Sequence, residues 1–222
     1  MHLDKQQKSA IALALLPVLV IWQINGIYLA ALAGISVSLF WLADFIQWII
    51  LPLALLVFLA KNASLLPKHY GLDTSTLRWQ SAILETLAMF ATAGLVFFVV
   101  RKLSWQLLNH PTGFFTFPGV SPGGLMGSFI WLYSAVTAGV VESVFFIGLP
   151  WLLYCNIRNH PSRATFMFIV STIFSVAHWE QGLHIVVAAF CFHLVACAWF
   201  FKLNTLWPVA VGHTLIDMVA FA

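Results

Sequence analysis

Three residues in the C-terminal half of the chain could activate a water molecule together, although they lie far apart in the sequence. Glu142 is the single acid in the apolar run "GVVESVFFIGLPW" (Gly139–Trp151). His178 and His213 follow at intervals of 36 and 35 residues, which is one helical hairpin each. A carboxylate and two imidazoles at one buried point can accept a proton from water, orient the water and stabilise a developing oxyanion.

Helical spacing adds a partner to each histidine. Asp217 follows His213 by four residues, so the two share a helix face, and Asp217 is expected to hold the His213 ring. Phe174 precedes His178 by the same interval, which puts an aromatic ring beneath that histidine. The alternative chemistry is a zinc site in which Glu142, His178 and His213 bind the metal and leave one position for water.

The composition indicates whether these residues lie in a soluble or a membrane protein. The chain has 222 residues, of which 62% are hydrophobic and 8% are charged. Soluble domains are about 25% charged, and a soluble chain of this size could not bury so much apolar surface in one core. The composition therefore predicts a multi-pass membrane protein in contact with the lipid bilayer. No basic block suggests nucleic-acid binding.

The apolar runs predict an all-α fold, a polytopic membrane helix bundle of about seven transmembrane helices. A membrane-spanning helix needs roughly 20 mainly apolar residues. Such runs occupy about residues 9–31, 37–60, 81–100, 125–156, 164–180, 183–201 and 205–222. The polar stretch "QING" (Gln23–Gly26) interrupts the first run, which could instead be a short span followed by a surface piece. The fourth run is longer than one span needs, so it is expected to tilt or break.

Basic residues predict the orientation of the bundle. With seven spans and a cytoplasmic N-terminus, two basic residues, Arg101 and Lys102, fall in loops on the outside. The expected inside loops hold eight: Lys5, Lys8, Lys61, Lys68, Arg78, Arg158, Arg163 and Lys202. Because cytoplasmic loops carry an excess of Lys and Arg, this division supports the span count and the cytoplasmic N-terminus.

Other polar residues in or beside the apolar runs have structural interpretations. Asp44 and Glu85 are expected to hold neighbouring helices together by hydrogen bonds. Glu180 is expected to be solvated at the interface, with a position facing the substrate as the alternative. His184 and His193 are expected to serve packing or to line a substrate path.

The order of these residues resembles a known family of membrane proteases. Glu142, then "FSVAH" (Phe174–His178), then "HTLID" (His213–Asp217) is similar to the three motifs of the CPBP family. This family comprises the CAAX-prenyl endopeptidases and the bacteriocin-processing intramembrane proteases, also called the Abi family. The resemblance covers about residues 125–222, the expected catalytic core. Residues 1–124 are then N-terminal transmembrane helices and loops of the same integral membrane domain.

The resemblance implies an intramembrane endopeptidase of the glutamic type that needs no cofactor. Glu142 would be the general base with help from His178, and His213, held by Asp217, would stabilise the oxyanion. The four catalytic residues implied are Glu142, His178, His213 and Asp217. Three further positions are implied to contact the substrate: Ser143, Phe146 and Phe174.

Two residues depart from the family's first motif. Ser143 replaces a second glutamate, and Ile147 replaces an arginine that would bring a fixed positive charge near the site. These departures keep a second hypothesis open, a catalytically inactive membrane scaffold on the same bundle. The acids and histidines within the spans leave a third, a small proton-linked transporter.

The resemblance also suggests a substrate class and a location. The expected substrate is a membrane-anchored protein or peptide precursor, and the expected location is a bacterial inner (cytoplasmic) membrane. A subset of the family is associated with proteins that carry C-terminal sorting signals, and this chain is a candidate member of that subset. The expected positions of His178 and His213 along their spans favour an active site nearer the outer leaflet.

Overall fold

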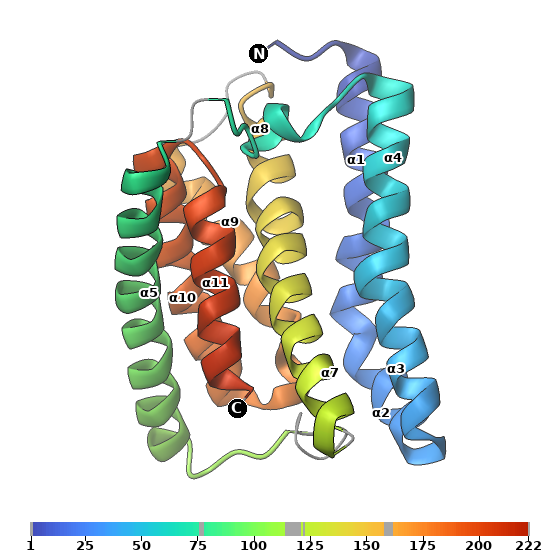
Figure 1. Cartoon of the computed structure of the whole chain (residues 1–222), viewed down its shortest axis with the longest axis vertical. Coiled ribbons are helices and arrows are strands. Elements are labelled where there is room, and N and C mark those ends of the chain that lie inside the picture. Colours follow the sequence, from blue (N-terminus) through green and yellow to red (C-terminus); the bar gives the residue numbers. More distant parts are fainter. Residues whose placement is uncertain (1, 76–77, 114–120, 122, 158–161, 222) are drawn as a thin grey trace.

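The computed structural model describes residues 2–75, 78–113, 121, 123–157 and 162–221, and within these ranges the chain is all-α (Figure 1). Seven helical segments coincide with the seven apolar runs. The first comprises α1 (Lys5–Ile21), a 3₁₀ turn (Trp22–Ile24) and α2 (Asn25–Ile35). The other six are α3 to α4 (Val37–Ala63, with a π-helix at Ile46–Ile50), α5 (Trp79–Leu107), α7 to α8 (Gly124–Tyr154), α9 (Arg163–Val176), α10 (Leu183–Leu203) and α11 (Trp207–Ala220).

Five of these described segments are long and apolar enough to cross a membrane, which confirms a multi-pass membrane protein. The other two, α9 and α11, have 14 residues each. A helix of 14 residues rises about 21 Å, less than the roughly 30 Å of a hydrocarbon core. Seven helical segments are therefore present, but five of the described segments, and not the predicted seven, are long and apolar enough to span the membrane.

The first segment does not leave the bundle at its polar stretch. Trp22, Asn25 and Gly26 are all buried, so "QING" is an internal part of a continuous segment of 31 residues. The N-terminus of this segment is closed by Asp4. Its side chain accepts a hydrogen bond from the backbone N–H of Gln7, whose own side chain accepts one from the backbone N–H of Asp4.

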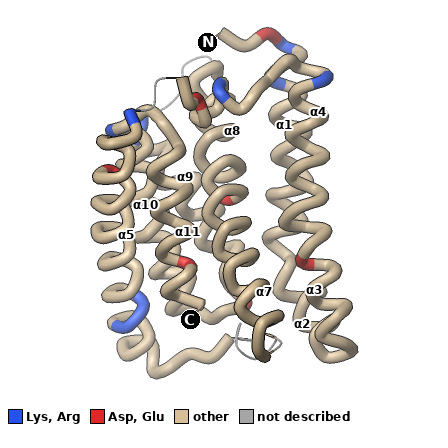
Figure 2. The backbone as a smooth tube through the Cα atoms, viewed as in Figure 1, with Lys and Arg blue, Asp and Glu red and all other residues tan. Residues whose placement is uncertain are grey.

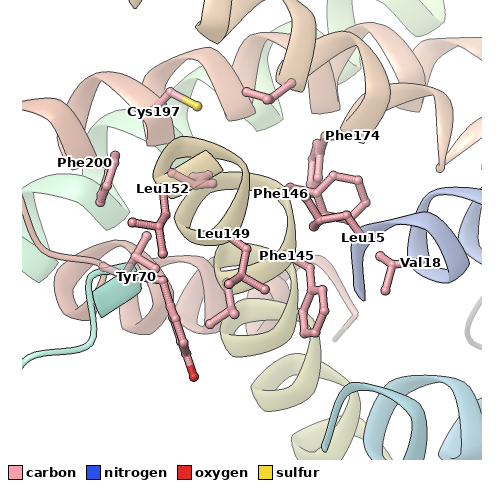
Figure 3. Close-up of a cluster of buried hydrophobic side chains, with 14 of the residues drawn as sticks. Leu15, Val18, Tyr70, Phe145, Phe146, Leu149, Leu152, Phe174, Cys197 and Phe200 are labelled. Atoms are coloured by element: carbon pink, nitrogen blue, oxygen red, sulfur yellow. The ribbon is translucent and has the colours of Figure 1, made fainter. Parts of the chain in front are cut away.

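One hydrophobic core joins the N-terminal and C-terminal parts of the chain. Leu15 and Val18 of α1 lie in the same cluster as Phe145, Phe146 and Phe174 (Figure 3). Around this core, α10 packs against α5 and α9, and α11 packs against α5 and the segment that carries Glu142. Residues on both sides of position 124 therefore contribute to one hydrophobic core.

Basic residues mark the two ends of the bundle. Figure 2 shows the Lys and Arg positions gathered at both ends, most of them at the end where the chain begins. The helix ends agree, since α1 begins at Lys5, α9 begins at Arg163 and α10 ends just after Lys202. Arg158 lies outside the described residues. The prediction of a cytoplasmic N-terminus depends on this distribution of Lys and Arg.

Candidate active site

Glu142 lies in an unusual stretch of helix. The segment that follows α7 (Gly124–Thr137) is a π-helix, η4 (Ala138–Gly148), which continues into α8 (Leu149–Tyr154). π-helical turns are rare and occur frequently at functional sites. Glu142 is 5% exposed at the centre of this segment. The fourth run is thus a continuous helical segment that contains a π-helix, and the described residues show no break in it.

A glycine brings η4 against α11. A Cβ atom added at Gly139 would lie 2.6 Å from the backbone nitrogen of Thr214 and 2.8 Å from the carbonyl oxygen of Ala210. Real Cβ atoms do not approach backbone so closely, so only glycine permits this contact. Thr214 follows His213 directly, and the close approach therefore sets the distance between the Glu142 helix and the His213 helix.

Two carboxyl groups face one nitrogen of His213. The Nε2 atom of His213 lies 3.5 Å from Oε2 of Glu142 and 3.4 Å from Oδ2 of Asp217. Asp217 comes from the next turn of α11, as the four-residue spacing predicts. Glu142 and His213 are each 5% exposed. A small shortening of these two distances would give hydrogen bonds along which the three groups can exchange protons.

His178 stands at the C-terminal end of α9. Its Nδ1 lies 2.9 Å from the carbonyl oxygen of Phe174, one of the carbonyls left unpaired where the helix ends. A carbonyl oxygen only accepts hydrogen bonds, so Nδ1 is the donor, and Nε2 of the neutral ring is then an acceptor. The Phe174 ring also packs against the imidazole, with centroids 4.7 Å apart, as predicted.

A cavity of about 450 Å³ brings the predicted catalytic residues together. Its lining includes Glu142, His178, His213 and Asp217, and it also includes the two aromatic residues predicted to contact substrate, Phe146 and Phe174. Within the described chain, His178 forms no hydrogen bond or ion pair with Glu142, so the two share the cavity without touching.

Ser143 is the one predicted site residue that does not line this cavity. It is buried, and its hydroxyl donates a 2.6 Å hydrogen bond to the carbonyl oxygen of Gly139 within η4. Ile147, at the position of the family's arginine, is buried in the hydrophobic core. The two departures in the first motif therefore serve the packing of the helix itself.

Glu180 is more important to the cavity than the sequence indicated. It was expected to be solvated, but it is 3% exposed and lines the cavity. The reason is a tertiary contact, because the turn at Trp179–Gln181 packs on Gly26 of α2, where an added Cβ would collide with the Glu180 side chain. Burial raises the pKa of Glu180 to about 7. Nothing local in "HWEQGL" signals this contact.

Further polar residues complete the lining and its support. Asn25, Asp44, Arg101 and His184 line the same cavity. Asp44 also accepts a 3.0 Å hydrogen bond from Tyr133, which ties α3 to α7 in the structural role expected for it. These residues come from α2, α3, α5 and α10, so the N-terminal segments form part of the cavity wall.

His193 supports the site without lining the cavity. Its ring stacks on Phe174 with centroids 4.4 Å apart, and its Nδ1 lies 3.0 Å from the hydroxyl of Ser171. Phe174 in turn supplies the carbonyl that holds His178. His193 thus has the packing role that the sequence suggested for it.

The donor geometry does not fit the zinc alternative. Among the described residues, no group of three or more His, Cys, Asp or Glu side chains is placed to hold a metal ion. Both carboxylates approach the same atom of His213, the Nε2 that a metal would also need. We therefore derive no chemical step through a metal.

Comparison with family models bears on the same part of the chain. Residues 122–219 match the model described as "Rce1-like: Type II CAAX prenyl endopeptidase Rce1-like". No curated protein and no solved structure matched the chain. The matched residues contain Glu142, His178, His213 and Asp217, which the fold brings to one cavity. Residues 122–219 of this membrane protein therefore form a CAAX protease (CPBP) family domain of the Rce1-like type.

Proposed function

We propose that this protein is an intramembrane endopeptidase that hydrolyses a peptide bond of a membrane-associated protein or peptide precursor. The observation that carries the proposal is the position of His213. Its Nε2 lies 3.5 Å from Glu142 and 3.4 Å from Asp217, inside a cavity that His178 also lines. The family match to type II CAAX prenyl endopeptidases supports a protease.

The proposed chemistry needs only these side chains and water. Glu142 accepts a proton from water as the water oxygen attacks the carbonyl carbon of the peptide bond. The carbonyl oxygen becomes an oxyanion and accepts a hydrogen bond from His213. The proton on Glu142 then passes to the leaving nitrogen as the C–N bond breaks. The products are one new carboxyl group and one new amine.

Two residues position the reacting groups. The Phe174 carbonyl fixes the tautomer of His178, whose free Nε2 accepts a hydrogen bond from the attacking water. Asp217 holds the His213 ring from one turn further along α11. Phe146 and Phe174 offer an apolar surface to the chain being cut, whereas Ser143 has no such surface in the cavity.

The substrate and the setting follow from the family and the membrane fold. We propose a membrane-anchored substrate, taken from the bilayer, in a bacterial inner membrane with the N-terminus of the protease in the cytoplasm. The support is the gathering of Lys and Arg at the end of the bundle where the chain begins. A protein with a C-terminal sorting signal remains the narrower candidate within this class.

The test is a comparison of new protein termini in cells. A host strain lacking the gene would be complemented with wild type, Glu142→Gln or Glu85→Gln, and the termini of membrane proteins would be quantified by mass spectrometry. We expect at least one membrane protein to gain a new terminus with wild type and with Glu85→Gln, and none with Glu142→Gln. Glu85 is a matched control because it lies on α5 outside the cavity lining.

The proposal fails if Glu142→Gln restores every terminus that wild type produces. Equal amounts of wild type and Glu142→Gln in the membrane fraction would show that the variant is not degraded. A second candidate function, an inactive scaffold, is favoured by Ser143 and Ile147, whose side chains are used for packing. The scaffold predicts that wild type and Glu142→Gln give the same set of termini and the same phenotype.

A further inference from the structure

A second polar corner of the cavity lies where the N-terminal segment meets the turn between α9 and α10. The side chain of Gln23 donates a 2.9 Å hydrogen bond to the carbonyl of Ile173, and the indole of Trp179 donates one of 2.9 Å to the carbonyl of Gln23. Gly26 of α2 lies directly against the side chain of Glu180. These contacts fix Glu180 beside the first turn of α2.

Two oxygen atoms in this corner lack hydrogen-bond donors. Oε2 of Glu180 and Oδ1 of Asn25 are buried and have no hydrogen-bond partner among the described residues. The two side chains are 3% and 7% exposed, and both line the cavity. The other oxygen of Glu180 has only a 3.5 Å contact with the amide of Gln181.

Unpaired buried acceptors are costly. Leaving one such group without a partner destabilises the folded state, so each unpaired buried acceptor calls for an explanation. A ligand that brings hydrogen-bond donors into the cavity would remove this cost. Because a carboxylate oxygen accepts hydrogen bonds, a ligand that presents N–H or O–H groups at this corner would satisfy Glu180.

The charge of the cavity favours a cation. Its lining contains four acids and one Lys or Arg, the Arg101 guanidinium. The four acids are Asp44, Glu142, Glu180 and Asp217, out of seven in the whole chain. In the described part of the chain, Glu180 makes no ion pair with Arg101 or any other cation. A positively charged group would therefore supply the counter-charge that the Glu180 carboxylate lacks.

The shape and lining of the cavity favour an organic cation on an apolar stem. Aromatic side chains from the N-terminal segments form part of the cavity wall, namely Trp22, Phe40, Trp41 and Trp48. Such rings attract ammonium and guanidinium groups and pack against aliphatic stems. No metal-binding group of three ligands includes Glu180 among the described residues. The volume of about 450 Å³ is within the range of ordinary ligand pockets.

We propose that Glu180 and Asn25 form a subsite for a Lys or Arg side chain of the protein that is cleaved. The inference rests on the proposed proteolytic function and adds the class of residue that the substrate must carry. Membrane-anchored proteins commonly place Lys and Arg at the ends of their spans, so such residues are available beside the bilayer. Glu180 binds the charge, and Asn25 accepts a second hydrogen bond.

The test measures binding of synthetic peptides to the full chain in lipid nanodiscs. Each fluorescent peptide has roughly 20 Leu and Ala residues and a single Lys placed at successive positions along one flank, and a matched series carries Gln instead. We expect at least one Lys peptide to bind wild type about tenfold more tightly than its Gln counterpart. Glu180→Gln should abolish that preference. Glu180→Arg should shift the preference to a peptide with Glu at that position.

Two controls separate this site from the catalytic chemistry and from misfolding. Glu142→Gln should keep the Lys preference even though it abolishes cleavage, so a failed protease assay would leave the binding result intact. Glu85→Gln, on α5 outside the cavity, should bind as wild type does. The proposal is overturned if no Lys peptide is preferred by wild type, or if the preference persists in Glu180→Gln with an unchanged melting temperature.

Discussion

Gly139 lies against Thr214 so closely that a Cβ atom at the glycine would stand 2.6 Å from the threonine's backbone nitrogen. This contact joins η4 to α11 at the level of the candidate active site. It places Glu142 and His213 within 3.5 Å of each other, although the two residues are separated by a hairpin of two helices. Helix spacing, and not side-chain reach alone, therefore controls the candidate site.

Replacement of Gly139 by Ala should displace α11 from η4. Two of the three nearest atoms are backbone and cannot rotate away. We therefore expect a loss of stability of about 1–3 kcal/mol, as for other overpacked core positions. Cleavage of the natural substrate by Gly139→Ala should also fall. The fall should be larger than the fraction of unfolded variant alone would cause. Thermal melting in detergent and the cleavage assay would check this.

Gly34 is the matched control for that substitution. It lies in α2, and a Cβ atom there would meet no other atom within 4 Å. Alanine favours the helix over glycine by about 1 kcal/mol, so Gly34→Ala should leave stability equal or slightly higher. Equal effects of the two substitutions would argue against the close contact at Gly139.

Substitution of Ser143 by Ala should have little effect on cleavage. The hydroxyl is engaged with the Gly139 carbonyl and does not line the cavity. Loss of this internal hydrogen bond should cost about 1 kcal/mol of stability. The measurement is cleavage rate per folded molecule. A loss of more than about tenfold in rate with normal stability would show that Ser143 contacts the substrate, as its motif position suggested.

Substitution of Phe174 by Ala should disturb its three histidine partners at once. The ring is 1% exposed and packs against His178, His193 and His213. Removal of a buried phenylalanine typically costs about 3–5 kcal/mol. We also expect slower cleavage in the fraction that stays folded, because the His178 ring loses its support. Denaturant titration in mixed micelles, followed by cleavage assays, would measure both effects.

The control for Phe174 is on the same helix. Phe168 is 61% exposed and faces away from the cavity lining. Its replacement by Ala should change stability by less than about 1 kcal/mol and leave cleavage unchanged. If Phe168→Ala were as harmful as Phe174→Ala, the effect would reflect the loss of apolar side chains in general.

The ionisation of Glu180 should make stability depend on pH. Burial raises its pKa from 4.5 to about 7, so between these values the folded protein holds a proton that the unfolded chain has released. Stability from this group is full below pH 4.5 and is lost as the pH rises to about 7. At about 1.4 kcal/mol per pH unit, the loss is about 3 kcal/mol at most.

Comparison with Glu180→Gln isolates this contribution. The unfolding free energy of wild type minus that of the variant should fall as the pH rises from 4.5 to about 7 and then stay level. His178 and His184 titrate in both proteins, so their contributions cancel. A difference that is constant across this pH range would show that Glu180 is not buried as described.

The sequence predicted the helical segments and the proximity of His213 to Glu142. Long apolar runs are a direct consequence of membrane crossing, and the four-residue spacing of His213 and Asp217 requires a shared helix face. The family resemblance added that the residues from three helices meet. The structure places all of them around one cavity.

The sequence could not predict the features that depend on distant contacts. The run around Glu142 is apolar on all sides, so its pattern cannot reveal a π-helix or the direction in which Ser143 points. Glu180 is buried by Gly26, which is 154 positions away in the chain. A local motif carries no information about such a neighbour.

The two hydrogen bonds at Gln23 have a consequence for how this protein would evolve or be engineered. The family match begins at residue 122, yet Trp22 and Asn25, which flank Gln23, line the cavity, and Gln23 ties this segment to Ile173 and Trp179. A chimera that joins residues 122–219 to the first helices of another protein would keep the reactive groups and lose one wall of their chamber. The proposed preference for a Lys or Arg side chain would thus depend partly on helices that the family match does not cover.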